Sequence, residues 1–339
     1  EKRYFGRRMV SPPEEIWSKS LSAYHGGRTE AFALGKFRDV TVLDVASMFP
    51  SMMLEGGFPI PWGPFSRHRE GDSLSPSGVY RARIQVPEGV FPSLPVRTDN
   101  GTIFPIGTIV GDYVGEELIY SRSIGCQVDI LDGVRFLETV DPFDKYVRAM
   151  FRRKSRSRGV IRSVYKLLLN GLYGKFGQRG ERMMATPISS FLKKQNPPDN
   201  FRIWCGIVFY EESGNPPPWG NNLWAAIITA RARIRLHREI LKLRARGCRI
   251  LYSDTDSIAF TGNGGRYPVK AKIGEFEKRG EFPEMIIVGK KEYALRDKSG
   301  TWHPHVKGIP TQERMRYLLT GEAEYSRPVR IRESSRISQ

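Results

Sequence analysis

The chain has 339 residues, of which 54 are lysine or arginine and 36 are aspartate or glutamate, so its formal net charge is +18 at pH 7. Its uninterrupted apolar runs are far shorter than the ~20 residues that a membrane-spanning helix needs, which argues against a transmembrane protein. The three cysteines lie far apart and form no CxxC pair. Neither a disulfide framework nor a cysteine zinc site is therefore predicted.

The positive charge favours a polyanionic partner, either nucleic acid or an acidic membrane surface. The sequence contains no strongly amphipathic basic helix with an aromatic face, which is the pattern of a membrane-surface helix. Nucleic acid is therefore the predicted partner, and no membrane partner is expected. The N-terminus has no apolar signal region and no initiator methionine. We expect a trimmed or processed fragment of a protein that is not secreted.

The first half of the chain is predicted to be rich in strands. Residues 38–48 begin as an apolar strand that ends near Asp44, and residues 56–64 form a proline- and glycine-rich turn region. Between residues 80 and 86, apolar side chains alternate with Arg and Gln, the pattern of a half-buried strand.

Helices are predicted next. Asp141 and Pro142 have the residue types of an N-cap and a first helical position, and the helix that they start is expected to end at Gly159. A second helix covers about 160–175, residues 179–220 are expected to be irregular, and a long helix follows over about 222–246 and is capped by Gly247.

The stretch LYSDTDSIAF, residues 251–260, predicts a hairpin of two strands with Ser-Asp-Thr-Asp as its turn. A further strand is predicted near 285–288, ahead of GKKEYAL. His303 and His305 have no acids or cysteines close to them in sequence, so a metal site is not expected there. Strands, an inserted helix pair and more strands together predict an α+β fold with one catalytic centre.

Asp254 and Asp256 lie one residue apart in the predicted turn. Aspartate is common in solvated turns, but two carboxylates at this spacing also suit a divalent cation. If they bind a metal, Asp44 is the candidate for a third carboxylate, because a buried strand seldom ends in an acid that has no partner. Two such clusters in a basic chain suggest two-metal phosphoryl transfer.

The second predicted helix carries a basic face. Arg158, Arg162 and Lys166 are four residues apart in succession and so lie on one side of a helix, with Lys154 just before it. Such a face could bind phosphates. A solvated basic surface or a nuclear-localisation run is the alternative, and by itself the pattern favours that alternative.

Four motifs, in order along the chain, resemble those of family B DNA polymerases. Residues 44–51 (DVASMFPS) resemble the first motif, DxxSLYPS, and residues 166–174 (KLLLNGLYG) resemble the second, KxxxNSxYG. Residues 252–257 (YSDTDS) match YxDTDS, and residues 290–293 (KKEY) match KKxY. Residues 24–27 (YHGG) resemble the YxGG element of the protein-primed branch, including members from tailed bacteriophages.

The resemblance implies roles for the acidic residues. Asp44, Asp254 and Asp256 would be the catalytic acids. Asp44 and Asp256 would bind the metal with the carbonyl of Val45, and Asp254 would be an adjacent or weaker ligand. The implied cofactor is two Mg²⁺ ions, with Mn²⁺ as a substitute.

The resemblance also implies substrate contacts. The residues implied to bind the incoming nucleotide are Lys154, Arg162, Lys166, Asn170, Phe49 and Tyr173. The residues implied to bind DNA are Tyr24, Gly26, Gly27, Gly174, Lys290, Lys291 and Tyr293. Within these sets, the three basic residues would hold the triphosphate, and Lys291 and Tyr293 would hold the primer terminus.

Two positions depart from the family pattern. Phe49 stands where the family usually has the tyrosine that blocks the ribose 2′-hydroxyl, and its ring should largely preserve that exclusion. Gly171 replaces the usual serine, which loosens the helix by up to ~1 kcal/mol and removes a hydroxyl close to the minor groove.

The implied fold is a right-hand polymerase core with an antiparallel-sheet palm, helical fingers and a small thumb. The expected divisions are palm start with the template-contact element and first motif (1–50), palm and insertion (51–140), fingers (141–178), palm with a small insertion and the catalytic hairpin (179–289), and thumb (290–339). Only 43 residues precede Asp44, so a 3′–5′ exonuclease domain is not expected in this chain.

The implied function is template-directed addition of dNTPs to a primer 3′ end, in viral or mobile-element replication. The implied partners are primer-template DNA, dNTP and, as a candidate primer, a terminal protein. The implied location is the cytoplasm or the nucleoid or nucleus of a host cell. Two alternatives stay open, namely a non-catalytic DNA-binding subunit derived from such a polymerase and a primer-independent polymerase.

Overall fold

The computed structural model describes residues 13–98, 101–178, 182–194, 197–198, 201–212, 217, 220–269, 271–309 and 311–321. The chain divides into two compact units. The first unit comprises Glu1–Gly26 and Ser47–Ile234, and the second comprises Gly27–Ala46 and Arg235–Gln339. In the described ranges, no helix combines the length and the apolar character that crossing a membrane requires.

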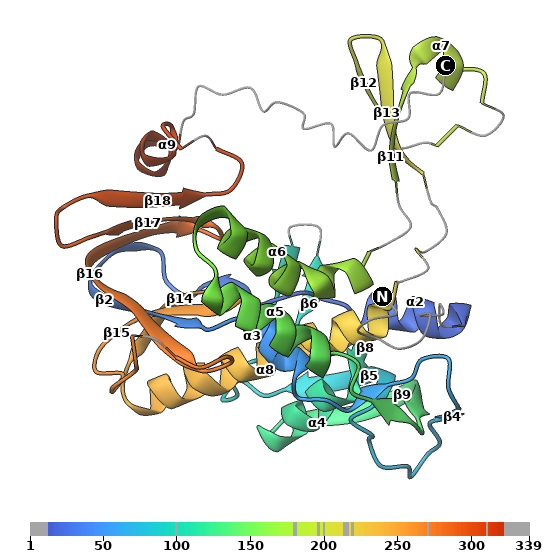
Figure 1. Cartoon of the computed structure of the whole chain (residues 1–339). Helices are drawn as coiled ribbons and strands as arrows, with labels where there is room; N and C mark the ends of the chain where they lie inside the picture. The colour runs from blue at the N-terminus through green and yellow to red at the C-terminus, as the bar shows by residue number, and fades with distance from the viewer. Residues whose placement is uncertain are drawn as a thin grey trace. The chain divides into compact units, whose positions relative to one another are not determined.

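The second unit is built on one seven-stranded sheet with the order β1-β14-β15-β2-β16-β17-β18, in which every neighbouring pair is antiparallel (Figure 1). Its strands are β1 (Thr29–Ala31), β2 (Gly35–Val45), β14 (Arg249–Asp254), β15 (Ser257–Thr261), β16 (Phe276–Gly289), β17 (Glu292–Arg296) and β18 (Trp302–Val306). Helix α9 (Arg314–Thr320) packs near β18 with Leu318 buried. The central position of β2 agrees with the apolar strand predicted to end near Asp44.

The strand predicted near 285–288 is only part of β16, which runs over 14 residues. Gly280 and Pro283 resemble strand breakers in the sequence. The structure accommodates Gly280 at a register shift between β16 and β2, so the strand continues past it. The expected thumb region, 290–339, extends beyond residue 321, and its last part lies outside the described residues.

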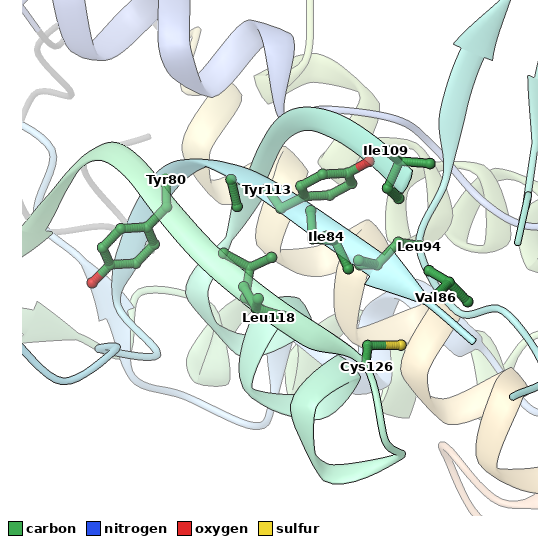
Figure 2. Packing of buried hydrophobic residues seen from close by; sticks show 10 residues of the cluster. Tyr80, Ile84, Val86, Leu94, Ile109, Tyr113, Leu118 and Cys126 are labelled. Carbon is green, nitrogen blue, oxygen red and sulfur yellow. The ribbon is translucent and has the colours of Figure 1, made fainter. Parts of the chain in front are cut away.

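The first unit contains a four-stranded antiparallel sheet with the order β4-β9-β5-β8. Its strands are β4 (Phe65–Arg67), β5 (Gly78–Val86), β8 (Gly107–Val114) and β9 (Gln127–Phe136), and α4 (Gly115–Ser123) follows β8 directly. Ile84 and Val86 of β5 pack with Leu118 of α4 and Cys126 in the core shown in Figure 2. Buried and exposed residues alternate from Tyr80 to Val86, as predicted.

Smaller elements complete this part of the first unit. They are α2 (Glu14–Ser22), α3 (Met48–Met53), and the two-stranded pairs β3 (Phe58–Pro59) with β10 (Thr139–Val140) and β6 (Val96–Thr98) with β7 (Gly101–Ile103). The ring of Phe58 meets Phe143 edge-on at a centroid distance of 4.8 Å. This contact anchors the start of the helix pair.

The predicted helix pair consists of α5 (Asp144–Arg156) and α6 (Gly159–Phe176). The predicted N-cap Asp141 was wrong by two residues, since Phe143 is the N-cap and α5 begins at Asp144. The Asp141 carboxylate instead accepts a hydrogen bond from the Gly57 backbone N–H at 2.6 Å, and Phe143 is fully buried before the helix begins. The first helix was expected to end at Gly159, but α5 ends at Arg156, and Gly159 is instead the first residue of α6. Gly159 has φ +54°, a conformation that suits glycine.

The expectation that residues 179–220 are irregular was wrong for much of the described part. Strands β11 (Arg182–Pro187), β12 (Phe201–Trp204) and β13 (Ile207–Glu212) form an antiparallel sheet with the order β11-β13-β12, accompanied by α7 (Ile188–Phe191). Phe191, Val208 and Tyr210 form its small core. Among the described prolines, Pro187 is the last residue of β11, and Pro197 and Pro198 precede β12, so these prolines do not prevent the sheet.

The long helix predicted over about 222–246 is confirmed as α8 (Asn222–Ala245), and Gly247 follows it with φ +78°. Its residues up to Ile234 are grouped with the first unit and the remainder with the second. The helix is buried on more than one side, since both apolar residues such as Leu236 and polar residues such as His237 have 0–1% exposure.

Candidate active site

The hairpin of β14 and β15 in the second unit presents the two aspartates of the YSDTDS motif. Strand β14 ends at Asp254 and β15 begins at Ser257, so only Thr255 and Asp256 form the turn, fewer than the four residues that the sequence suggested. The Asp256 N–H donates to the Asp254 carbonyl at 2.6 Å, and Thr255 has φ +63°. The hairpin itself is as predicted.

Asp44 lies beside this turn on the neighbouring strand. It is the register partner of Ser257 in the β15–β2 ladder, and the Val45 N–H donates to the Asp256 carbonyl at 2.9 Å. The structure thus brings Asp44 beside two carboxylates that follow it by more than two hundred residues in sequence. Two neighbouring antiparallel strands fix their spacing through main-chain hydrogen bonds.

The two hairpin carboxylates differ in their surroundings. Asp254 Oδ1 accepts from Lys291 Nζ at 2.5 Å and from Thr29 Oγ1 at 2.9 Å. Burial, followed by the negative charges of Asp44 and Asp254, raises the pKa of Asp256 to about 6, against a smaller lowering by Arg279. The positive charge of Lys291 therefore balances the carboxylate of Asp254. The ionised form of Asp256 is instead disfavoured by burial and by the neighbouring carboxylates.

A pH dependence of stability follows from Asp256. Its pKa of about 6 lies above the ordinary value of 3.8, so the folded protein holds this proton more tightly than the unfolded chain does. Its contribution is fully present below about pH 4 and is lost as pH rises through about 6. Without divalent metal, Asp256→Asn should therefore have a higher Tm than the unsubstituted chain at pH 8, and the difference should shrink towards pH 4. Thermal unfolding in EDTA from pH 4 to 8 measures this; an equal or lower Tm of the variant at pH 8 would contradict it.

The donor atoms at this site suit a hard cation. Carboxylate and carbonyl oxygens are the ligands that Mg²⁺ prefers, and a positive ion would turn the repulsion between Asp44 and Asp256 into attraction. Across the described residues, no group of three or more His, Cys, Asp or Glu side chains is arranged to enclose a metal. Mg²⁺ in proteins is commonly bound by one or two carboxylates together with water and substrate phosphates.

The KKEY motif borders the same carboxylates. Lys290 and Lys291 lie between β16 and β17, and Lys291 has φ +61°. The Lys291 N–H donates to the Tyr252 hydroxyl at 2.8 Å, and the Tyr252 and Tyr293 rings lie 4.9 Å apart. The backbone of Lys291 is thus tied to the catalytic strand β14.

The two histidines of β18 have separate partners. His303 Nε2 lies 2.7 Å from Asp297 Oδ2, and the half-buried His305 stacks on Tyr293 at a centroid distance of 4.8 Å. Neither contact involves a second histidine or a cysteine.

The YHGG segment has a structural role in each unit. In the first unit, a Cβ on Gly177 would come within 2.5 Å of the Tyr24 ring, so Tyr24 packs closely on the end of α6. In the second unit, a Cβ on Gly27 would come within 2.8 Å of Thr255, and the Thr255 N–H donates to the Arg28 carbonyl at 2.6 Å. Glycine at 27 is therefore required for close packing on the hairpin turn, independently of any template contact.

A buried ion pair supports this segment in the first unit and was not predicted from the sequence. Arg233 of α8 and Glu117 of α4 have side chains that are each 1% exposed, with Arg233 Nη2 2.7 Å from Glu117 Oε2. Arg233 also donates to the Gly26 carbonyl. The only signal in the sequence was a set of arginines in an otherwise apolar helix, because a buried arginine requires a partner.

The basic residues of the helix pair fall into two groups. Lys154 Nζ of α5 donates to Ser47 Oγ, within the first motif, at 3.0 Å. Arg162 and Lys166 are exposed on α6 with the predicted helical spacing. Arg158 was expected on the same helix face, but it precedes the helix as its N-cap with an extended backbone. Asn170 is half-buried and Gly174 exposed on the same helix.

Phe49 and Tyr173 meet within the first unit. Their rings stack at a centroid distance of 3.9 Å with an interplanar angle of 30°. Phe49 belongs to α3 and Tyr173 to α6, so the first and second motifs contact each other directly. The stack limits the rotation of the Phe49 ring and supports it as a rigid steric barrier.

Removing that ring should change sugar selectivity. We expect Phe49→Ala to admit ribonucleotides by opening space beside C2′, whereas Phe49→Tyr should behave almost like the unsubstituted chain. Loss of the steric barrier should lower the preference for dNTP over rNTP by about 100-fold, corresponding to ~3 kcal/mol. Incorporation of a single dNTP or rNTP opposite a defined base measures the ratio. Unchanged discrimination in the alanine variant would assign the barrier to another side chain.

Comparison with known proteins places these motifs in a family. Residues 9–196, more than half of the chain, match the model of the family described as DNA polymerase type B, organellar and viral. This chain belongs to that family. The resemblance suggested by the four ordered motifs is therefore confirmed.

Relatives in this polymerase family come from fungi and bacteriophages. A probable DNA polymerase of Podospora anserina is 24% identical over 332 residues, which cover 87% of this chain and 27% of that protein. The DNA polymerase of Bacillus phage phi29 is 28% identical over 260 residues, covering 71% of this chain and 42% of that protein. The chain thus spans less than half the length of these curated relatives.

Solved structures of the family share the fold. Phi29 DNA polymerase complexed with primer-template DNA and incoming nucleotide aligns with a TM-score of 0.74 and 19% identity, covering 93% of this chain and 59% of that one. The predicted α+β fold of a right-hand polymerase is confirmed by this likeness.

Proposed function

We propose that this chain is the polymerase core of a template-directed DNA polymerase that adds dNTPs to a primer 3′ end. The observation that carries the proposal is the placement of Asp44 and Asp256 on adjoining main-chain-bonded strands, in a chain of net charge +18. Membership of the family described as DNA polymerase type B, organellar and viral, and the order of the four motifs along the chain support it.

Asp44, Asp256 and the Val45 carbonyl are the proposed ligands of two Mg²⁺ ions, which Mn²⁺ could replace. When bound, these ions would supply positive charge for the attacking primer 3′-oxygen and for the triphosphate. Asp254, held by Lys291, orients the hairpin and adds negative charge beside the ligands.

The remaining residues would bind and orient the substrates. Lys154, Arg162 and Lys166 neutralise the triphosphate, and the positions of Asn170, Tyr173 and Gly174 suit contact with the nascent base pair. Phe49 excludes the ribose 2′-hydroxyl. Lys290, Lys291 and Tyr293 hold the primer terminus, and Tyr24, Gly26 and Gly27 contact the template strand.

The proposed partners are primer-template DNA and dNTP, the ligands of the phi29 polymerase complex. Priming by a terminal protein is proposed from the YHGG segment. The division into palm, fingers and thumb, with fingers at 141–178 and thumb from 290, is likewise proposed from the family motifs.

Extension of a labelled primer tests the proposal. With Mg²⁺, the chain should add only the dNTP complementary to the next template base, and it should not extend when Mg²⁺ is replaced by EDTA. Binding of primer-template without extension would favour the alternative of a non-catalytic DNA-binding subunit. Synthesis on a template without any primer would favour the primer-independent polymerase.

A further inference from the structure

Arg279 occupies a β-bulge beside the catalytic carboxylates. In the β16–β2 ladder, Glu277 is the partner of Asp44 and Lys278 that of Leu43, and the register then shifts so that Gly280 faces Val42. Arg279 is the extra residue at this shift. A bulge next to an active site commonly redirects a side chain, and Arg279 is exposed.

The guanidinium of Arg279 acts on groups from three different elements. Its positive charge lowers the pKa of Asp256 in the hairpin turn and of Tyr293 on β17, where the larger effect of burial raises the pKa. It also lowers the pKa of His305 on β18, in the same direction as the larger effect of burial. Tyr293 and His305 stack on each other. These effects accompany the geometry of the bulge, which places Arg279 two residues after Glu277, the register partner of Asp44.

Neighbouring cations in the second unit are already paired. Lys278 pairs with Glu281, Lys291 with Asp254, and Arg296 with Glu284. In the part of the chain that the structure describes, no carboxylate lies within ion-pair distance of Arg279. The guanidinium of Arg279 is thus available to bind an anionic ligand, because it forms no direct ion pair with the carboxylates of the described residues.

We propose that Arg279 binds a phosphodiester of the primer strand close to its 3′ end. This inference rests on the proposed function, because the primer end must lie at the carboxylates and the bulge places Arg279 two residues after the register partner of Asp44. A guanidinium suits this role since its planar set of donors can bind two phosphate oxygens together. Arg279 would keep the primer end in register with the carboxylates without contacting the reacting atoms, so it is a positioning residue.

Neutralising single phosphates in the primer tests the contact. Arg279→Gln is combined with primers that carry one methylphosphonate at the last or the penultimate linkage, and primer-template affinity is measured at several salt concentrations. Lys298→Gln is the matched control, because Lys298 is exposed in the turn between β17 and β18 and its loss removes the same charge.

Arg279→Gln should weaken binding about tenfold, as expected for a hydrogen bond between charged groups, and should flatten the plot of log affinity against log salt by about 0.9. One methylphosphonate should weaken binding by the unsubstituted chain and by Lys298→Gln, but should have little further effect on Arg279→Gln. This non-additivity would identify the phosphate that Arg279 contacts.

Fully additive losses at both linkages, or an unchanged salt slope, would overturn the proposal. An unchanged affinity with a lower Mg²⁺ requirement would also overturn it and would assign Arg279 to balancing the carboxylates. Because the assay measures binding, it is separate from the test of polymerase activity. If the chain extends primers but Arg279→Gln and the methylphosphonate have additive effects, only the proposed role of Arg279 is rejected. If their effects are non-additive but no extension occurs, the role of Arg279 is supported and the polymerase function is rejected.

Discussion

Asp44→Asn and Asp256→Asn should each lower primer extension by about a thousandfold or more. Each substitution removes one anionic ligand from a site that has few protein ligands. The weaker metal binding should raise the activation free energy by ~4 kcal/mol or more, which is the energy equivalent of this rate loss. DNA binding should stay within about threefold of that of the unsubstituted chain, because neither carboxylate is a phosphate contact. Single-turnover extension and a binding titration on the same primer-template separate the two effects.

Glu281→Gln is the matched control for this pair. Glu281 is an exposed carboxylate of β16 that pairs with Lys278, so its replacement removes the same charge from the same unit. Its extension rate should be unchanged. Extension by Asp44→Asn or Asp256→Asn at the rate of this control would remove the metal assignment.

Lys166→Ala should produce the second large effect, a rise in the apparent KM for dNTP together with a lower kcat. A cation that interacts with charge developing on the leaving pyrophosphate acts more strongly in the transition state than in the ground state. We expect kcat/KM to fall by about 100-fold, or ~2.7 kcal/mol, with little change in DNA affinity. Steady-state kinetics at saturating primer-template give both constants.

Lys175→Ala provides the comparison, since Lys175 is an exposed lysine in the last turn of the same helix, outside the Arg158, Arg162 and Lys166 spacing. It should leave dNTP kinetics unchanged. A tenfold loss of template affinity in Lys166→Ala with unaltered nucleotide kinetics would instead make Lys166 a template contact.

Local patterns in the sequence were enough to predict several elements. The LYSDTDSIAF hairpin, the alternating strand around Ile84 and the helix α6 each depend on neighbouring residues, and the structure has all three. The motif order also predicted that Asp44 would join the hairpin acids. That contact spans more than two hundred residues, and it was inferred from family resemblance as well as from the isolated acid at a strand end.

Long-range packing decided the features that were missed. Asp141 resembled a helix cap, but its carboxylate binds the backbone of Gly57. The β11-β13-β12 sheet has a core of few residues among prolines and glycines, so its pattern is weak. The Arg233–Glu117 pair and the bulge at Arg279 depend on which strands and helices become neighbours, and no local pattern specifies that.

Metal binding by the assembled complex tests the central claim most directly. Mn²⁺ binding is measured by electron paramagnetic resonance with primer-template that ends in a dideoxynucleotide and with the next complementary dNTP, so that no reaction occurs. We predict two Mn²⁺ ions held in the complex of the unsubstituted chain, with weakened binding in Asp44→Asn and Asp256→Asn and unchanged binding in Glu281→Gln. Equal Mn²⁺ binding by the unsubstituted chain and both asparagine variants would contradict the assignment of Asp44 and Asp256 as the metal ligands.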